Sequence, residues 1–404
     1  MQLSTRYIPI FISLISIAEI SNRLPFNTFI FNIITIWLLK FILIMNIIIY
    51  HKNNFHPINN KDYTYVNIFI IWSIIGIIRG GWKAEDYWEW KQFFICMFNS
   101  LLPILCYVFY SPYILKKTLQ LWIKICIPVY FLVILWFVPI GVHHFFLGPA
   151  IILALFIPII PIKWKLILSF ILIITIFGDL GGRSQVIKSL VVALFIVAYL
   201  SRHLYSHKLL KILHTACYVI PIVLIYLGVS GIYNIFNDEK TSSTISSGTS
   251  LTTEDTRTFI YQEVISSAIK NNYLIWGRTQ ARGNDTNAFS ESFIDIKKAH
   301  IERSMNEVCH LNIFTWLGLI GIILYSLIYF RSSYLAIYKS NNIFLKFIGV
   351  FIAFRWAYGW IEDINNFDAM SISIWMLISM GLSDYFRKMN NIEFKKWVLS
   401  IFKN

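Results

Sequence analysis

Long apolar runs separated by short polar segments dominate the chain. About 20 apolar residues let an α-helix cross the roughly 30 Å hydrocarbon core of a membrane, and a helix makes every backbone hydrogen bond within its own segment. A membrane β-barrel has short alternating segments instead. The pattern therefore predicts an all-α polytopic membrane protein. The expected transmembrane helices, about twelve by this criterion, cover 7–23, 27–50, 64–80, 93–111, 119–140, 149–162, 164–178, 185–201, 212–233, 311–330, 343–359 and 370–386.

Composition and charge support the same class. Of the 404 residues, 57% are hydrophobic and only 14% are charged, with a net charge of +14. The Lys and Arg residues lie in short loops and not in one patch, so the positive charge is explained by the orientation of the helices in the membrane. We therefore expect no nucleic-acid partner. The five cysteines contain no C-x-x-C pair, which supports neither a disulfide framework nor a metal site. We expect no metal and no cofactor.

The basic residues concentrate in alternate loops. With the N-terminus in the cytoplasm, the inside loops hold most Lys and Arg, whereas the outside loop GVHHFFLG has none and IEDINNFD is purely acidic. The positive-inside rule then places both termini in the cytoplasm. The expected organisation is helices 1–9 over residues 1–233, one large extracytoplasmic loop containing helices over 234–310, helices 10–12 over 311–386 and a cytoplasmic tail over 387–404.

Two helical patterns are expected in the large loop. The first follows the capping-box spacing TTED and runs from Arg257 to Lys270, where two asparagines end it. The second begins near Phe293 and continues into the tenth membrane helix without a Gly or Pro. Such a helix would hold four ionisable side chains within an arc of about 80°. This stripe is either a solvated face with one ion pair or a site at the membrane edge; its members are His300, Arg303, Glu307 and His310.

Arginines are unusually frequent in the loops assigned to the outside. Arg183 follows two glycines in GGRSQ, at the start of the expected eighth helix. One interpretation is an arginine at the membrane interface whose charge reaches water. The other is a phosphate-binding residue, because the glycines and the helix N-terminus leave room for an anion and the guanidinium donates two parallel hydrogen bonds. The excess of outside arginines favours an anionic ligand. The others are Arg79, Arg257, Arg278, Arg282 and Arg303.

Three local sequences resemble the O-antigen ligase/polymerase superfamily, which includes Wzy-type polysaccharide polymerases and O-antigen ligases. GGRSQVIKSLVVAL is similar to the arginine-containing turn of that family. TRTFIYQEVISSAIKNNYLIWG is similar to its helix that begins with Arg and ends in a Gly, with Tyr273 where Pro is common. NEVCHLNIFTWLGLIG resembles the end of its external loop, followed by an apolar G-x-x-G helix. Glu307 stands where the ligase pattern has His, and His310 lies one turn later, which favours a polymerase.

The resemblance implies a GT-C-like glycosyltransferase in the bacterial cytoplasmic (inner) membrane. It would polymerise undecaprenyl-diphosphate-linked oligosaccharide repeat units into O-antigen or capsule-type polysaccharide on the outer face, by metal-independent inverting transfer. The alternatives are an O-antigen ligase acting on lipid A-core and a lipid-linked oligosaccharide flippase or transporter. Besides the lipid-linked oligosaccharide and membrane lipid, the implied partners are a chain-length regulator and a flippase.

The resemblance also implies roles for individual residues. Glu307 is the first candidate for the catalytic base and His310 the second. A diphosphate is the expected ligand of three arginines, Arg183, Arg257 and Arg303. Further substrate contacts are expected from Arg79, Arg278, Arg282 and His300.

Overall fold

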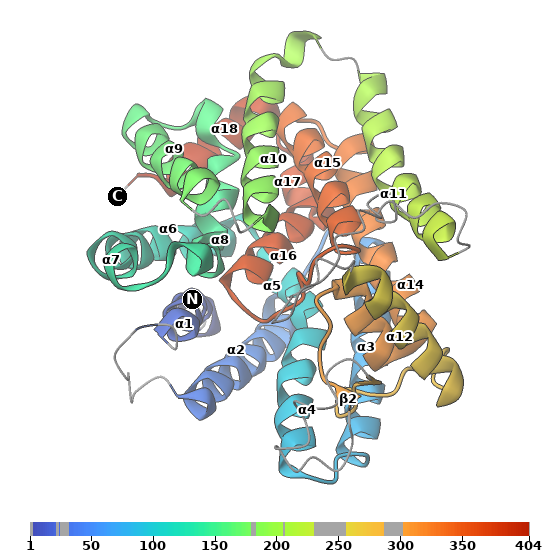
Figure 1. The fold of residues 1–404 in the computed structure, drawn as a ribbon. Coiled ribbons are helices and arrows are strands. Elements are labelled where there is room, and N and C mark those ends of the chain that lie inside the picture. Colours follow the sequence, from blue (N-terminus) through green and yellow to red (C-terminus); the bar gives the residue numbers. More distant parts are fainter. Residues whose placement is uncertain are drawn as a thin grey trace, which may run out of the picture.

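The computed structural model describes residues 3–21, 24, 32–178, 183–204, 207–229, 256–286 and 302–403. Helices form almost all of its regular structure (Figure 1), so the all-α prediction is confirmed. The helices of the first half are α1 (Leu3–Ser21), α2 (Ile33–Asn54), α3 (Thr64–Gly81), α4 (Tyr87–Ser100), α5 (Cys106–Phe109), α6 (Pro112–Val129), α7 (Leu135–Phe137), α8 (His143–Ala154), α9 (Ile162–Phe177) and α10 (Arg183–Leu200). The second half has α11 (His207–Val229), α12 (Thr256–Lys270), α14 (Cys309–Tyr338), α15 (Ile343–Tyr358), α16 (Ala369–Leu382), α17 (Asp384–Lys388) and α18 (Asn391–Ile401). The short strands β1 (Asn284–Asp285) and β2 (Glu302–Arg303) pair antiparallel.

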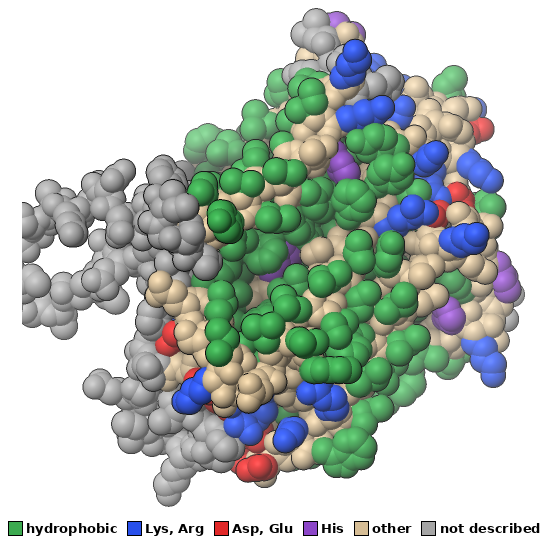
Figure 2. Space-filling view, turned by 90° about the vertical axis from the view of Figure 1, so that its right-hand side faces the viewer, with side chains coloured by type: hydrophobic (Ala, Val, Ile, Leu, Met, Phe, Trp, Pro, Cys, Tyr) green, Lys and Arg blue, Asp and Glu red, His purple; other side chains and the backbone are tan. Residues whose placement is uncertain are grey.

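Six helical segments of the described chain are long and apolar enough to cross a membrane: Ile33–Asn54, Asn60–Gly81, Tyr87–Phe109, Pro112–Phe137, Lys208–Leu227 and Cys309–Tyr338. Large apolar side chains remain exposed along α2, α3, α9, α10 and α11, and Figure 2 shows a wide apolar band between two zones of charged side chains. Membrane embedding is therefore supported as predicted. Each of the twelve expected ranges contains a helix, but the count of twelve crossings stays a prediction.

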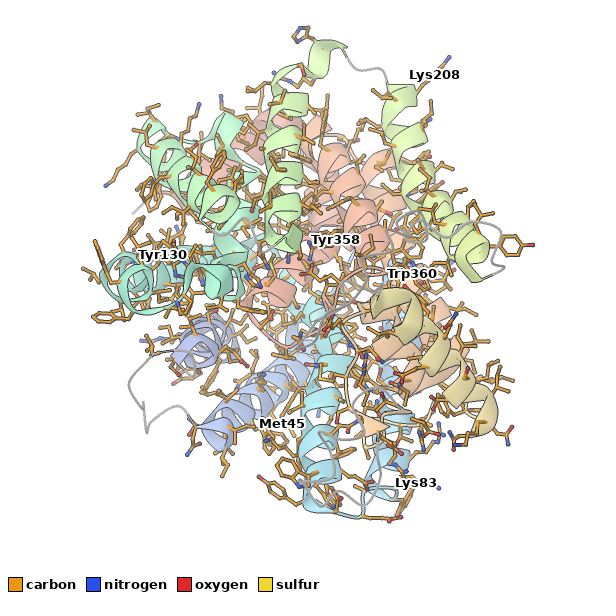
Figure 3. The ribbon with its side chains drawn as sticks, in the orientation of Figure 1. Met45, Lys83, Tyr130, Lys208, Tyr358 and Trp360 are labelled. Carbon is orange, nitrogen blue, oxygen red and sulfur yellow. The ribbon has the colours of Figure 1, made fainter. Side chains whose placement is uncertain are left out.

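The sides of the membrane also stay a prediction. Figure 3 shows Lys83, in the loop after α3, and Lys208, near the start of α11, at opposite ends of the molecule. The positive-inside argument had assigned these two loops to opposite sides. The arrangement agrees with the expected alternation, but it does not identify which end faces the cytoplasm.

Asn and Asp side chains cap the first turn of several helices. The Asp86 carboxylate accepts a hydrogen bond from the Glu89 N–H at 2.8 Å, and the Asp368 carboxylate accepts one from the Ser371 N–H at 2.8 Å. Asn342 caps α15 in the same way. Each cap satisfies one of the N–H groups that the first turn of a helix leaves free, which explains why these helices begin at these residues.

The central helix α14 is broken at Gly318. Its backbone there has φ 69° and ψ −166°, outside the helical region, and the chain from Leu274 to Arg278 fits into the break. The Leu319 N–H donates to the Leu274 carbonyl at 3.0 Å, and the Arg278 N–H donates to the Thr315 carbonyl at 2.7 Å. The freed helical hydrogen bonds are thus replaced by bonds to a loop, which fixes the 274–278 segment against the bundle core.

One expectation for the region before α14 is wrong. Glu302 and Arg303 form β2, and residues 304–308 are not helical, so no continuous helix runs through this stretch into α14. The strand pairing with β1 and the entry of the loop against α14 override the local helical pattern. Arg303, Glu307 and His310 therefore do not lie on one helical face.

The segment predicted to be a cytoplasmic tail, residues 387–404, contains α18, which buries Phe394 and Trp397 against the bundle. Its side of the membrane stays a prediction.

The helix expected from Arg257 to Lys270 is confirmed as α12. It ends where Asn272 adopts a positive φ of 56°, a conformation that asparagine tolerates better than most residues. The capping-box residues that would precede it lie outside the described residues. Because α12 packs Ile260, Val264 and Ala268 against residues at the start of α14, it holds the loop region close to the membrane bundle.

Candidate functional site

Four segments distant in the sequence meet where α15 connects to α16. The Ser184 hydroxyl, at the start of α10, donates to the Glu362 carboxylate. The Tyr261 hydroxyl of α12 donates to the Trp360 carbonyl at 2.5 Å, and the Cys309 N–H at the start of α14 donates to the Glu362 carbonyl at 3.2 Å. Figure 3 shows Trp360 beside α12, with Tyr358 between it and α10. We call this meeting point, defined by these five hydrogen-bonded residues, the junction.

His310 is fixed inside the junction. Its side chain is 1% exposed, and its ring lies edge-on to the Trp360 ring with a centroid distance of 4.2 Å. The Nε2 atom lies 3.1 Å from the Trp356 carbonyl oxygen. Because a carbonyl only accepts, Nε2 carries the proton in this bond, and Nδ1 is then the nitrogen able to accept one.

Glu307 differs from His310 in its accessibility. It is exposed and lies in the turn two residues before α14 begins. The two candidate bases are therefore in different environments, although the sequence had placed them on one helical face. Neither catalytic role is tested by this arrangement, and both stay predictions. A carboxylate in contact with water is accessible to a large acceptor sugar, whereas His310 requires the surrounding aromatic side chains to move.

The two principal arginine candidates begin helices at the junction. Arg183 is the first residue of α10, directly before Ser184, and Arg257 lies one turn before Tyr261 in α12. Their helices are described, but their side chains are not. His300 lies outside the described residues. The structure therefore brings together the backbone positions of Arg183, Arg257 and His310 around one loop.

Three charged residues at the junction were not among the predicted site residues. Lys188 is 4% exposed, and its Nζ atom lies 2.8 Å from Oε1 of Glu362. Arg355, one turn before the end of α15, is 2% exposed. One sequence signal could have identified Arg355: it is an arginine inside an otherwise apolar run, and a buried charge in a membrane protein is costly and usually functional. In the connection between α15 and α16, next to Glu362, burial raises the pKa of the Asp363 carboxyl to about 7.

The other predicted arginines have protein partners. Arg79 donates to the Trp276 and Gly277 carbonyls at 2.8 and 3.0 Å, and so joins α3 to the loop that breaks α14. Nη2 of Arg303 is 3.9 Å from the Glu263 carboxylate. These bonds account for the two arginines without an external anion. Their roles in substrate or diphosphate binding stay predictions.

Arg278 and Arg282 share one acidic partner. Nη2 of Arg278 lies 2.8 Å from Oε1 of Glu302, and Arg282 donates from Nε and Nη2 to the same carboxylate. Glu302 also accepts from the Gly283 N–H at 2.9 Å. A further bond at 2.6 Å joins Arg278 to Asp285. This network neutralises both guanidinium groups and ties β1 to β2, which favours a structural role for them.

Glu302→Gln is expected to lower the free energy of unfolding by about 2 kcal/mol, because glutamine presents an NH₂ group to an arginine where the carboxylate had an acceptor. Thermal unfolding in detergent measures this change. Glu85→Gln is the control: its exposed carboxylate attracts Arg282 from a distance, and removing this screened charge should change the free energy by less than about 0.5 kcal/mol. Equal stability of the Glu302 variant and the wild type would contradict a structural role for the network.

The site chemistry is that of buried cations, a carboxylate and an imidazole. Among the residues that the structure describes, no three His, Cys, Asp or Glu side chains lie close enough together to hold a metal ion. Comparison with protein-family models, curated proteins and solved structures finds no match for this chain. The assignment of the site therefore rests on the geometry of the junction and on the local sequence resemblance.

Proposed function

We propose that this protein is a glycosyltransferase that polymerises undecaprenyl-diphosphate-linked oligosaccharide units on the outer face of the bacterial cytoplasmic membrane. The observation that carries the proposal is the junction. Each of the three local sequences that resemble the O-antigen ligase/polymerase superfamily contributes to it, through Ser184, Tyr261 and Cys309. Sequences selected only for hydropathy would have no reason to meet at one loop.

The proposed reaction needs stabilisation of a leaving diphosphate and a base for the acceptor. The acceptor hydroxyl oxygen attacks the anomeric carbon of the donor sugar and forms the new glycosidic bond. The bond from that carbon to the diphosphate oxygen breaks, and its electron pair leaves with the diphosphate. Arg183 and Arg257 are assigned to that developing negative charge, which fixed cations stabilise without reorganisation. One displacement of this kind inverts the anomeric configuration.

The hydroxyl proton passes to the base during the attack. Glu307 is the first candidate because it is exposed beside the junction and its carboxylate can accept directly. His310 is the second, and it would use Nδ1 because Nε2 is bonded to the Trp356 carbonyl. Glu307→Gln is expected to reduce polymer formation about 100-fold, the lower end of what general-base catalysis contributes. His310→Ala tests the second candidate.

The experiment is deletion of the gene, complementation with each variant and separation of the surface glycan on a gel. A core that carries a single repeat after deletion supports a polymerase. A core without repeats, together with accumulated lipid-linked polymer, would indicate a ligase. Loss of lipid-linked units from the outer face would indicate a flippase. Polymer yield with each variant is normalised to the amount of folded protein in the membrane.

His214→Ala is the matched control for His310→Ala. His214 is also buried, at 3% exposure, and its Nε2 atom is 3.0 Å from the Ser333 hydroxyl, away from the junction. Both substitutions leave a cavity of the same kind, so a loss specific to His310 reports on the site and not on packing. Unchanged polymer length and yield in both Glu307→Gln and His310→Ala would overturn the assigned base positions.

A further inference from the structure

Two cationic side chains are buried at the junction, Lys188 and Arg355. Lys188 and Arg355 are 4% and 2% exposed. Lys188 forms an ion pair with Glu362, whereas Arg355 has no carboxylate within ion-pair distance in the described chain and is attracted by Glu362 from farther away. The second cation therefore lacks a direct counterion. Removing a charge from water costs several kcal/mol unless it is paired and hydrogen-bonded. A buried guanidinium without a directly bonded carboxylate therefore favours a further, anionic partner.

The hydrogen bonds of this group are also incomplete. Five buried side-chain atoms between residues 355 and 365 have no hydrogen-bond partner in the described chain. Four of these five are donors: Nε and Nη2 of Arg355, Nε1 of Trp360 and Nδ2 of Asn365. The fifth is the acceptor Oε2 of Glu362. Since buried polar groups are normally satisfied, the two free donors of Arg355, whose charge interacts with Glu362, favour a ligand that is rich in acceptor oxygens.

We propose that Lys188 and Arg355 bind the diphosphate group of a polyprenyl-linked ligand and that Glu362 occupies this position when the ligand is absent. The Glu362 carboxylate neutralises only one of the two cations, whereas a diphosphate carries enough charge for both and more acceptor oxygens. Arginine suits this role because its planar guanidinium binds phosphate oxygens in pairs. The proposal rests on the proposed function for the identity of the lipid.

The surroundings fit a ligand with a charged head and an apolar chain. Glu362 lies in the connection between α15 and α16, outside any helix, so it can move without unwinding one. On α10, Ile187, Leu190 and Leu194 are exposed next to the buried Lys188. A head group at Lys188 would therefore have an apolar helix face beside it for its hydrocarbon chain. A phospholipid phosphate shares part of this chemistry, but its single phosphate group offers fewer oxygens and less charge.

The test measures the affinity of the purified full-length protein in nanodiscs for undecaprenyl diphosphate, a ligand without sugar. Lys188→Gln and Arg355→Gln are each expected to weaken binding at least about tenfold, and Glu362→Gln is expected to tighten it, because glutamine keeps the acceptor and removes the competing charge. Arg387→Gln is the matched control: Arg387 is an arginine of 4% exposure that contacts Asp62, far from the junction. Its affinity should equal that of the wild type.

Two results would overturn the proposal. One is wild-type affinity in both Lys188→Gln and Arg355→Gln; if the second variant does not fold, Arg355→Lys replaces it and should retain the charge but lose affinity. The other is displacement of undecaprenyl diphosphate by phosphatidylglycerol at equal concentration, which would assign the site to a phospholipid. Binding lost in these variants while deletion of the gene leaves the polymer intact would retain the site and reject the polymerase. If the variants bind normally but deletion of the gene abolishes the polymer, the polymerase is retained and the Lys188 and Arg355 site is rejected.

Discussion

Gly318→Ala is expected to prevent folding of the membrane bundle, at a cost of more than about 4 kcal/mol, a size reached only by a few mechanisms. Gly318 has φ 69° and ψ −166°, a combination that is essentially restricted to glycine. A Cβ atom at this position would also collide with the carbonyl of Ile275 and the N–H of Gly277. Both obstacles are backbone, so no side chain can rotate to relieve them.

The consequence extends beyond one residue because the 274–278 segment lies within the break of α14. Displacing it would remove the bonds from Leu319 to Leu274 and from Arg278 to Thr315, and would leave backbone groups of α14 unpaired in an apolar surrounding. Gly277 lies on the loop side of the same contact. Its φ is 72°, and a Cβ atom on it would collide with the α14 backbone. The two glycines therefore form one contact.

The measurement is the yield of monodisperse protein and its thermal midpoint in detergent. Gly81→Ala is the control, since a Cβ at the end of α3 meets no atom within 4 Å. This control should behave like the wild type. A Gly318→Ala protein that purifies with an unchanged midpoint would show that α14 is not broken at this residue.

The positions of the helices could be predicted from sequence because the membrane imposes them. An apolar run of sufficient length has no alternative that satisfies its backbone, so hydropathy alone located a helix in each expected range. The break at Gly318 was visible only as a G-x-x-G pattern, which also occurs in unbroken packed helices. What decides between them is the segment around Gly277, about forty residues earlier in the chain. Such a contact is not encoded locally.

The candidate site could also be predicted from the sequence only in part. Local patterns found Arg183, Arg257 and His310, whose helices meet at the junction. The assumption of one helix through residues 300–310 was wrong, because pairing between β1 and β2 depends on Asn284 and Asp285 in another part of the loop. Lys188 and Arg355 were not among the predicted site residues, although a single charge in an apolar run is itself a signal of function. What distinguishes them from isolated interface residues is their interaction with Glu362, an ion pair for Lys188 and a longer-range attraction for Arg355.

Asp62→Asn is expected to lower the free energy of unfolding by about 3–5 kcal/mol, the cost of breaking a buried ion pair by removing one partner. The Asp62 side chain is 1% exposed, and its two oxygens lie 2.6 Å from Nη2 of Arg331 and 2.6 Å from Nη2 of Arg387. Arg387 is itself 4% exposed. Asparagine would keep the shape and one acceptor, but it would leave the buried arginine with less compensation.

Asp384→Asn is the control that separates the loss of stability expected for Asp62→Asn from the effect of removing any carboxylate near Arg387. Asp384 also contacts Arg387, but its side chain is 16% exposed and Asp62 remains in place, so the expected loss is about 1 kcal/mol. Equilibrium unfolding in mixed micelles measures both values, and a double-mutant cycle with Arg331→Gln isolates the pairwise term. Equal effects of the two substitutions would contradict a special role for Asp62.

The Asp62 cluster also tests whether stability and ligand binding are separable in this fold. Asp62 joins the start of α3 to the end of α14 and to α17, whereas the junction lies at the other end of α14. Distant sites without shared partners usually act additively. Folded Asp62→Asn protein should therefore bind undecaprenyl diphosphate with wild-type affinity despite its lower stability. A coupled loss of affinity would mean that α14 transmits strain from one end to the other, across the break at Gly318.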